Sequence, residues 1–152
     1  MTLVNFTGMS THTATIEWKR DGDFARKNYK RAHTWRFDGG ITVRGAASPH
    51  VVPVPQTVED AVDPEEALVA SASSCHMLTF LFLAANDGFV AESYVDEAEG
   101  HLRGGWVAEI VLHPRIVWSG TPPTADQLAS LHHRAHEECF IARSLKSEIR
   151  VD

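Results

Sequence analysis

The sequence predicts an α+β fold in which groups of strands alternate with two helices. Residues 13–18 and 29–37 alternate between apolar and polar side chains, which is the pattern of half-buried strands. Asp63 followed by Pro64 forms a helix start, and Thr124 with Gln127 forms a capping box before a second helix. The chain has no internal repeat, low-complexity segment or linker, so we expect residues 1–152 to form a single domain.

The N-terminal strands are expected to form an antiparallel meander. Within residues 29–37 the aromatic side chains share one face of the strand, and Arg31 lies on that face as well. A turn at residues 38–40 leads into a short strand at 41–44. Residues 48–63 contain prolines that prevent a regular ladder, so we expect an extended loop there.

The first helix is expected to begin after Asp63 and to end at Gly88. Glu65 and Glu66 in its first turn face the positive end of the helix dipole. Residues 67–85 are small, apolar or weakly polar all round, which indicates a helix buried on most sides. A membrane span is disfavoured because hydroxyl side chains and a histidine interrupt the run and no basic residues flank it.

The C-terminal half predicts strands at 90–100 and 106–118, joined by a glycine turn at 104–105. Apolar residues recur at helical spacing in the second helix: Leu128, Leu131, Ala135 and Cys139. We therefore expect this helix to bury Cys139 on its apolar face. Residues 149–151 form a last strand that closes the chain.

The charge balance excludes two classes of partner. Fourteen basic residues against 20 acidic ones give a net charge of −6, so the basic surface that binds nucleic acids or anionic membranes is missing. Residues 1–10 show no basic and apolar pattern of a signal peptide. We expect a cytoplasmic protein that acts on small molecules or proteins.

The two cysteines are the strongest candidates for chemistry. Structural disulfides are rare in the cytoplasm, so Cys75 and Cys139 are either redox-active or simply two buried thiols. Cys75 lies in the middle of a helix, where the helix dipole does not acidify it, so it needs a nearby cation. Arg31 is a candidate cation that Glu65 is suited to hold, and an ordinary ion pair at a strand end is the alternative role for Arg31.

The histidines allow two other interpretations, and neither is favoured. His133, His136 and Cys139 recur every three residues, but this spacing drifts around a helix and no second ligand pair accompanies it. We therefore expect no metal and no cofactor. His76 follows Cys75 directly, and neighbouring helix positions point about 100° apart, which prevents a nucleophile and base pair.

Two segments carry a resemblance to a known family. They are Asp63-Pro64-Glu65-Glu66-Ala67-Leu68 through Ser73-Ser74-Cys75-His76, and Ala135-His136-Glu137-Glu138-Cys139 with Ser144-Leu145. Together with the element order, they resemble the OsmC/Ohr family of osmotically inducible and organic hydroperoxide resistance proteins, over about residues 12–152. The resemblance implies antiparallel sheets packed on a long central helix and a second helix, in an intertwined homodimer.

The resemblance also implies a reaction and its residues. Cys75 corresponds to the peroxidatic cysteine, Cys139 to the resolving cysteine, and Glu65 to the glutamate that follows a proline. The arginine comes from the N-terminal strands, where Arg31 is the first choice and Arg36 the second. The implied function is a thiol peroxidase that reduces organic hydroperoxides, and hydrogen peroxide as a second substrate, with an external dithiol of the lipoyl type or a small thiol as reductant.

The chain also departs from the family pattern. His76 replaces a bulky aromatic residue that often follows the first cysteine, and Phe140 replaces a proline that often follows the second. These departures indicate a divergent subgroup. The alternative function is a non-catalytic OsmC-like stress or small-molecule-binding protein.

Overall fold

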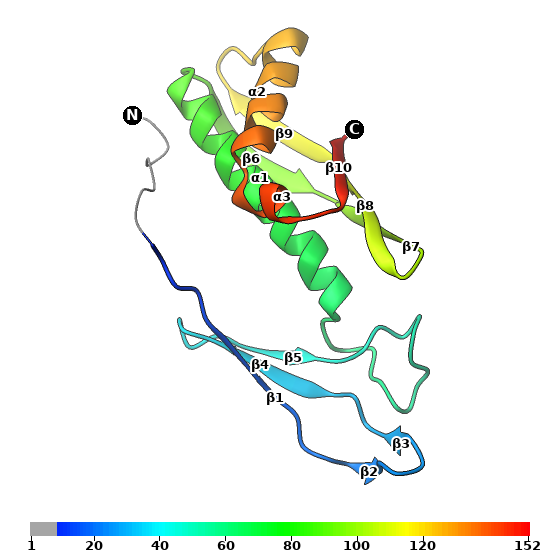
Figure 1. The fold of residues 1–152 in the computed structure, drawn as a ribbon. Helices are drawn as coiled ribbons and strands as arrows, with labels where there is room; N and C mark the ends of the chain where they lie inside the picture. Colours follow the sequence, from blue (N-terminus) through cyan, green and yellow to red (C-terminus); the bar gives the residue numbers. More distant parts are fainter. Residues whose placement is uncertain (1–8) are drawn as a thin grey trace. The chain divides into compact units, whose positions relative to one another are not determined.

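The computed structural model describes residues 9–152, which fold into two compact units (Figure 1). The N-terminal unit ends at Ala67, and the C-terminal unit spans Leu68–Asp152. Helix α1, Pro64–Asn86, begins in the first unit and continues in the second. Each of the two units has its own sheets.

The N-terminal unit is built on a three-stranded antiparallel sheet. Its order is β1 (Ala14–Glu17), β4 (His33–Phe37) and β5 (Thr42–Gly45), and a small hairpin pairs β2 (Gly22–Asp23) with β3 (Asn28–Tyr29). The meander is confirmed, but the single strand expected over residues 29–37 is broken between β3 and β4. The break occurs because the backbone N–H of Arg31 donates to Gln56 in the proline-rich loop, 2.7 Å away, instead of to a neighbouring strand.

One glycine makes the centre of this sheet possible. A Cβ on Gly45 would come within 2.6 Å of both Trp35 Nε1 and His33 Nε2. Those two side chains are joined by a 2.6 Å hydrogen bond in which the indole N–H donates. His33 Nε2 is thus an acceptor, so Nδ1 carries the proton and donates to the carbonyl of Arg31 at 2.8 Å. This chain of bonds holds the backbone that carries Arg31.

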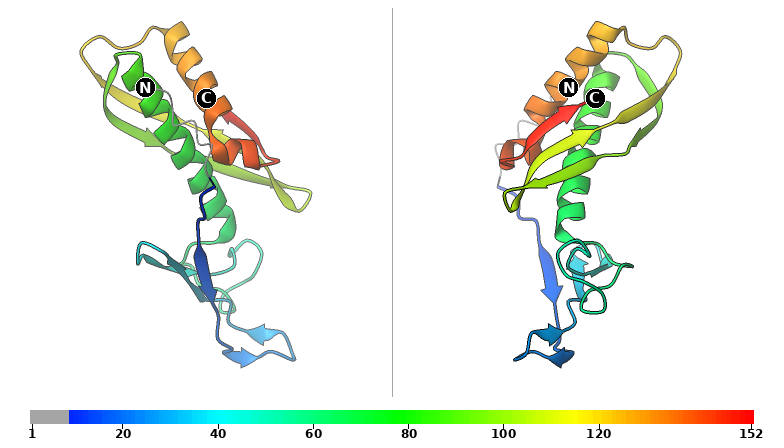
Figure 2. Two further views of the ribbon diagram at one scale, coloured as in Figure 1. Left: turned by 60° about the vertical axis from the view of Figure 1, so that its left-hand side comes forward. Right: turned by 90° about the vertical axis from the view of Figure 1, so that its right-hand side faces the viewer.

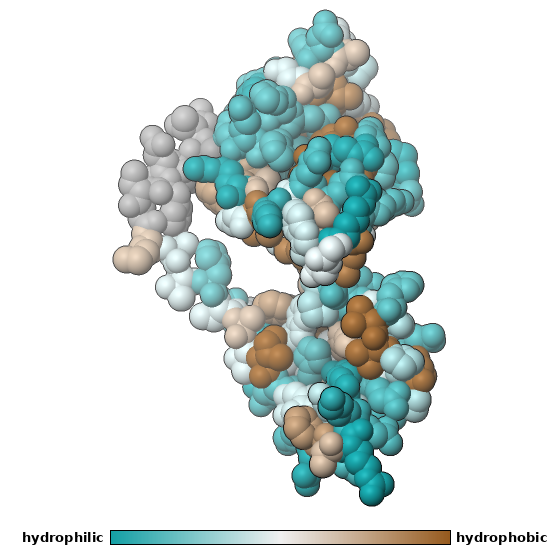
Figure 3. All heavy atoms as spheres, turned by 45° about the vertical axis from the view of Figure 1, so that its right-hand side comes forward, coloured by the Kyte–Doolittle hydropathy of each residue, from teal (hydrophilic) through white to brown (hydrophobic). Residues whose placement is uncertain are grey.

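The sequence predicts the first strand correctly, but its prediction that one face of this strand is buried is wrong. Every residue of β1 is exposed, and the Ile16 side chain is 58% exposed. The reason is that the N-terminal unit contains only the first turn of a helix, so its sheet has no second layer within the unit. Apolar side chains remain at the surface among polar ones (Figure 3).

Helix α1 begins and ends as the sequence predicts. The Asp63 carboxylate accepts from the Glu66 N–H at 2.8 Å, and the Glu66 carboxylate accepts from the Asp63 N–H at 3.0 Å, which completes a capping box. At the other end Gly88 adopts a φ of +86°, and the N–H of Phe89 donates to Ala84 at 2.9 Å. Local chemistry alone defines both ends.

The C-terminal unit combines the rest of α1 with two sheets and two further helices (Figure 2). The three-stranded sheet has the order β10 (Glu148–Val151), β8 (Trp106–Leu112) and β7 (Glu99–Arg103), and the two-stranded sheet pairs β6 (Val90–Asp96) with β9 (Pro114–Ser119). Helix α2 spans Ala125–Glu138 with the expected capping box, and α3 spans Phe140–Ser144. The strand pair β10 and β8 is parallel, whereas the other pairs are antiparallel.

Each of the two long strands expected here is divided in two. The first is divided after β6, and the second is divided at His113, between β8 and β9. The Asp96 carboxylate at the end of β6 accepts the backbone N–H of His113 at 2.6 Å. This bond satisfies an N–H at the break, where the chain passes from one sheet to the other.

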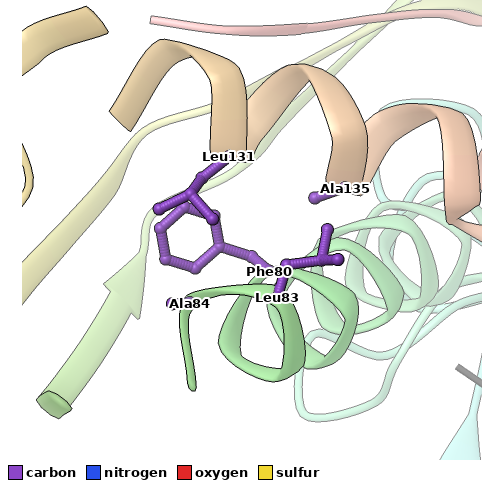
Figure 4. Packing of buried hydrophobic residues seen from close by; sticks show 5 residues of the cluster. All are labelled: Phe80, Leu83, Ala84, Leu131 and Ala135. Atoms are coloured by element: carbon purple, nitrogen blue, oxygen red, sulfur yellow. The ribbon is translucent and has the colours of Figure 1, made fainter. Parts of the chain in front are cut away.

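Two apolar clusters form the core of this unit. In the first, Phe80, Leu83 and Ala84 of α1 pack against Leu131 and Ala135 of α2 (Figure 4). In the second, Ala72 packs against residues of β8.

Only one face of α1 is buried in the chain, which corrects the expectation of burial on most sides. The buried positions are Ala72, His76, Thr79, Phe80, Leu83 and Ala84. Leu78 on another side is 62% exposed, because a single chain has too few layers to surround the helix. By length and composition α1 could cross a membrane, a test that core helices also meet, and 33% of its tested window is buried.

Candidate functional site

The two cysteines lie together in the C-terminal unit. Cys75 is a half-buried residue of α1, and Cys139 is 1% exposed. The side chain of Cys75 is close enough to the Cys139 thiol to help raise its pKa, and both cysteines are free. The structure therefore brings together the pair that the sequence singles out, in the reduced state.

The sequence predicts Cys139 on the apolar face of α2, and this prediction is wrong. The helix ends one residue earlier, and Cys139 has extended backbone angles between α2 and α3. Its sulfur accepts the N–H of Ala142 at 3.3 Å and so caps α3. The helical spacing of apolar residues indicated burial correctly, but it could not reveal that a cap replaces the last turn.

Burial sets the protonation state of Cys139. Removal from water raises the pKa of its thiol from an ordinary value of 9.0 to about 11, and the hydrogen bond to Cys75 acts in the same direction. The N–H of Ala142 opposes the shift more weakly. At neutral pH Cys139 is consequently a neutral thiol.

A pair of histidines joins α1 to α2, and one of them, His76, directly follows Cys75 in the chain. His76 Nε2 lies 3.0 Å from His132 Nδ1, and the two rings are nearly parallel, with 7° between their planes. His132 also stacks on Phe80, with ring centroids 4.4 Å apart. His76 is only 2% exposed. Sequence reasoning rejected His76 as a base for Cys75 and missed this pairing, because nothing local links residues 56 positions apart.

The histidine pair is held in the neutral form. The pKa of His76 is lowered to about 4, mainly by burial and then by the positive charge that His132 and His136 would carry. Asp96 on β6 partly opposes this shift. Burial also lowers the pKa of His132. One imidazole N–H is therefore shared between two neutral rings.

Asp96 organises a second polar group next to α1. It accepts the hydroxyl of Ser73 on α1 and the backbone N–H of His113. Nearby, the Tyr94 hydroxyl is buried and makes no hydrogen bond to any residue that the structure describes. No sequence pattern indicates a role for Asp96, because it lies at the end of an ordinary strand.

Arg31, Arg36 and Glu65 all belong to the N-terminal unit. Arg31 is half-buried, stacks its guanidinium over the Tyr29 ring at 3.6 Å and donates to the Tyr29 carbonyl at 2.5 Å. Arg36 is exposed and forms a 2.8 Å ion pair with Glu17 across the sheet. Glu65 is half-buried in the first turn of α1, and no ion pair links it to Arg31 within residues 9–152. The approach of Arg31 to Cys75 stays a prediction.

The three-residue histidine spacing serves no metal site in the described part of the chain. No group of three or more His, Cys, Asp or Glu side chains there has an arrangement that could hold a metal ion. His133 is exposed and lies 3.5 Å from Glu137 one turn later.

A family model described as OsmC-like protein matches residues 57–152, which is more than half of the chain. This chain belongs to the OsmC family. The match includes Glu65 and both cysteines, whereas Arg31 and Arg36 precede it.

Solved structures of the OsmC family share the fold. An OsmC-like protein of unknown function from Vibrio cholerae is 51% identical, with 95% of this chain and 99% of that chain covered and a TM-score of 0.90. An organic hydroperoxide resistance protein from Legionella pneumophila is 17% identical, with coverages of 96% and 99% and a TM-score of 0.65. An OsmC-like protein from Mycoplasma pneumoniae is 16% identical, with coverages of 94% and 95% and a TM-score of 0.69. No curated protein matches the chain. The expected α+β OsmC-like fold is confirmed.

The buried His76 predicts a loss of stability in acid. Its folded pKa of about 4 lies below the ordinary value of 6.5, so the unfolded chain binds the proton first, and stability falls as the pH drops from 6.5 toward 4. The full loss is about 3 kcal/mol, from a shift of about 2.5 pKa units. Urea unfolding of this OsmC family member from about pH 7 to about pH 4 measures the slope.

His76→Gln removes this titration and should flatten the slope in that range, although the carboxylates still contribute. The exposed His133→Gln is the matched control and should keep the wild-type slope. Equal slopes in the wild type and His76→Gln would contradict the assignment.

Proposed function

We propose that this OsmC family member is a cytoplasmic thiol peroxidase that reduces organic hydroperoxides through Cys75 and Cys139. The observation that carries the proposal is the interaction of the buried Cys139 thiol with the side chain of Cys75, which helps to raise the pKa of Cys139. Two thiols that already interact can form a disulfide with little movement of the chain. The Legionella relative, which is named for organic hydroperoxide resistance, supports the same substrate class.

The first step is oxidation of Cys75, the more accessible of the two sulfurs. Its thiolate attacks the distal oxygen of the hydroperoxide, a sulfur–oxygen bond forms and the oxygen–oxygen bond breaks. The leaving alkoxide takes up one proton and departs as an alcohol. Cys75 is then a sulfenic acid.

The second step uses the proton that Cys139 retains. The Cys139 sulfur attacks the sulfenic sulfur, a disulfide bond forms, and the hydroxyl of Cys75 leaves with the Cys139 proton as water. An external dithiol, of the lipoyl type or a small thiol, then reduces the disulfide and is itself oxidised. The high pKa of Cys139 suits this order, because a neutral thiol does not compete for the peroxide.

Arg31 is proposed to stabilise the Cys75 thiolate, and Glu65 to orient Arg31. A half-buried guanidinium without a carboxylate in the described chain needs a partner, since burying an unpaired charge is costly. Arg36 is already neutralised by Glu17. This difference favours Arg31 as the active-site arginine.

A homodimer is proposed to complete the site. Glu65 and Cys75 are ten residues apart on one helix, or roughly 15 Å at about 1.5 Å per residue. Two such helices packed antiparallel would bring Glu65 of one protomer toward Cys75 of its partner. A second copy would also cover exposed apolar residues of α1 such as Leu78.

Serine variants test the two cysteine roles. Cys75→Ser should abolish peroxide-dependent consumption of a dithiol, because the attacking thiolate is gone. Cys139→Ser should permit one oxidation and then accumulate sulfenic or over-oxidised Cys75, because no second thiol condenses with it. Mass spectrometry after one equivalent of peroxide reads the products. Oxidation that starts at Cys139 would reverse the roles of the two cysteines. A wild type that consumes no dithiol would support the non-catalytic alternative.

Arginine variants test the source of positive charge. Arg31→Ala should lower the thiolate fraction of Cys75 at neutral pH and slow peroxide attack about a hundredfold, the typical cost of losing one charge-stabilising donor. Ultraviolet thiolate absorbance and stopped-flow oxidation measure the two effects. Arg36→Ala is the matched control, and a larger effect there would make Arg36 the active-site residue.

Mixing variants tests the shared site. Glu65→Ala and Cys75→Ser are each expected to be inactive as homodimers, but a heterodimer would contain one intact site. Subunit exchange should therefore restore activity, to no more than one of the two sites. No recovery after exchange has been verified would show that each site is built within one chain.

A further inference from the structure

We propose that the hydrogen bond between His76 and His132 fixes the rotation of α1 against α2 and thereby positions Cys75 against Cys139. Cys75 and His76 are consecutive on α1. The partner of His76 is His132 within α2, and the partner of Cys75 is Cys139, which caps the C-terminal end of α2. Any rotation of α1 that separates the imidazoles also moves Cys75. The inference rests on the proposed function only in requiring that a disulfide between the two cysteines forms.

Hydrophobic burial alone gives α1 little rotational preference. Its residues between 67 and 85 are small, apolar or weakly polar on every side, and apolar residues such as Leu78 remain exposed. A rotation of the helix about its axis by about 100°, the angle between consecutive residues, would bury other apolar side chains in place of those that are buried now. An amphipathic helix resists this by its pattern, but α1 has no such pattern.

The hydrogen bond between His76 and His132 favours one rotation of α1. A hydrogen bond forms only at a narrow range of distances and angles, and the 3.0 Å contact lies within that range. Loss of the bond would leave His132 packed on Phe80 without its polar partner. Buried polar pairs are known to set register where apolar contacts do not.

Other polar contacts of α1 do not replace this one. Ser73 bonds to Asp96 and so joins α1 to β6, not to α2. Arg134 of α2 bonds to Asp87 just beyond the end of α1, but both side chains are more than one third exposed. Exposed ion pairs hold their geometry weakly. The histidine pair is therefore a buried hydrogen bond that joins α1 directly to a residue within α2.

The test is the stability of the disulfide rather than activity. The reduced and oxidised full-length chains are equilibrated with dithiothreitol at neutral pH and quantified by mass spectrometry after alkylation. The double variant His76→Leu with His132→Leu leaves no unpaired imidazole and should keep its stability, but its disulfide equilibrium constant should fall at least about tenfold, or about 30 mV. An unchanged constant in a folded double variant would overturn the proposal.

Two controls separate positioning from general destabilisation. Leu131→Ala removes apolar packing next to His132 and should lower thermal stability, yet it should leave the disulfide constant unchanged because both redox forms lose the same packing. His132→Asn places an amide near the position of Nδ1 and should restore the constant that His132→Leu loses. If the double variant does not fold, the comparison of His132→Asn with His132→Leu tests the proposal instead.

The outcomes distinguish this inference from the proposed peroxidase. If Leu131→Ala lowers the constant as much as the histidine variants do, or if His132→Asn fails to restore it, the positioning role is refuted and the peroxidase proposal is untouched. A wild type that forms the disulfide but consumes no peroxide refutes only the peroxidase. A wild type that forms no disulfide refutes both.

Discussion

The contact between α1 and α2 is the constraint on which the candidate site depends. Phe80 and Leu83 on one helix and Leu131 and Ala135 on the other are buried in one apolar cluster. One thiol lies on the first helix and the other directly follows the second. The same interface therefore builds the core of the unit and brings the two helices that carry the thiols together.

Low polarity in this interior explains the protonation states around the site. Burial raises the pKa of the Cys139 thiol and lowers that of the His76 imidazole, so both groups are neutral at neutral pH. The two shifts have opposite signs but one cause, since an apolar interior disfavours any charge. Cys75, by contrast, is only half-buried.

The N-terminal unit is incomplete as an isolated structure. Its sheet exposes apolar side chains such as Ile16, and Arg31 lacks a carboxylate among the described residues. Both features have the same physical meaning, because exposed apolar surface and a half-buried charge each gain free energy when another surface covers them. The proposed homodimer would account for both features, because a second copy would cover this surface.

The sequence by itself determined the local features of this protein. The helix start at Asp63, the capping box at Thr124, the helix end at Gly88 and the glycine turn at 104–105 depend on neighbouring residues, and the structure confirms them. The pairing of two cysteines as a candidate site also followed from residue type and family resemblance.

Only the tertiary structure decided the long-range features. These are the parallel pairing of β10 with β8, the division of the long strands, the capping position of Cys139 and the bond between His76 and His132. Helical and strand periodicity reports which side of an element is apolar, but not what lies opposite. For α1, which is apolar on every side, periodicity contains no orientation at all, so the buried face is decided by the partners that packing brings to it.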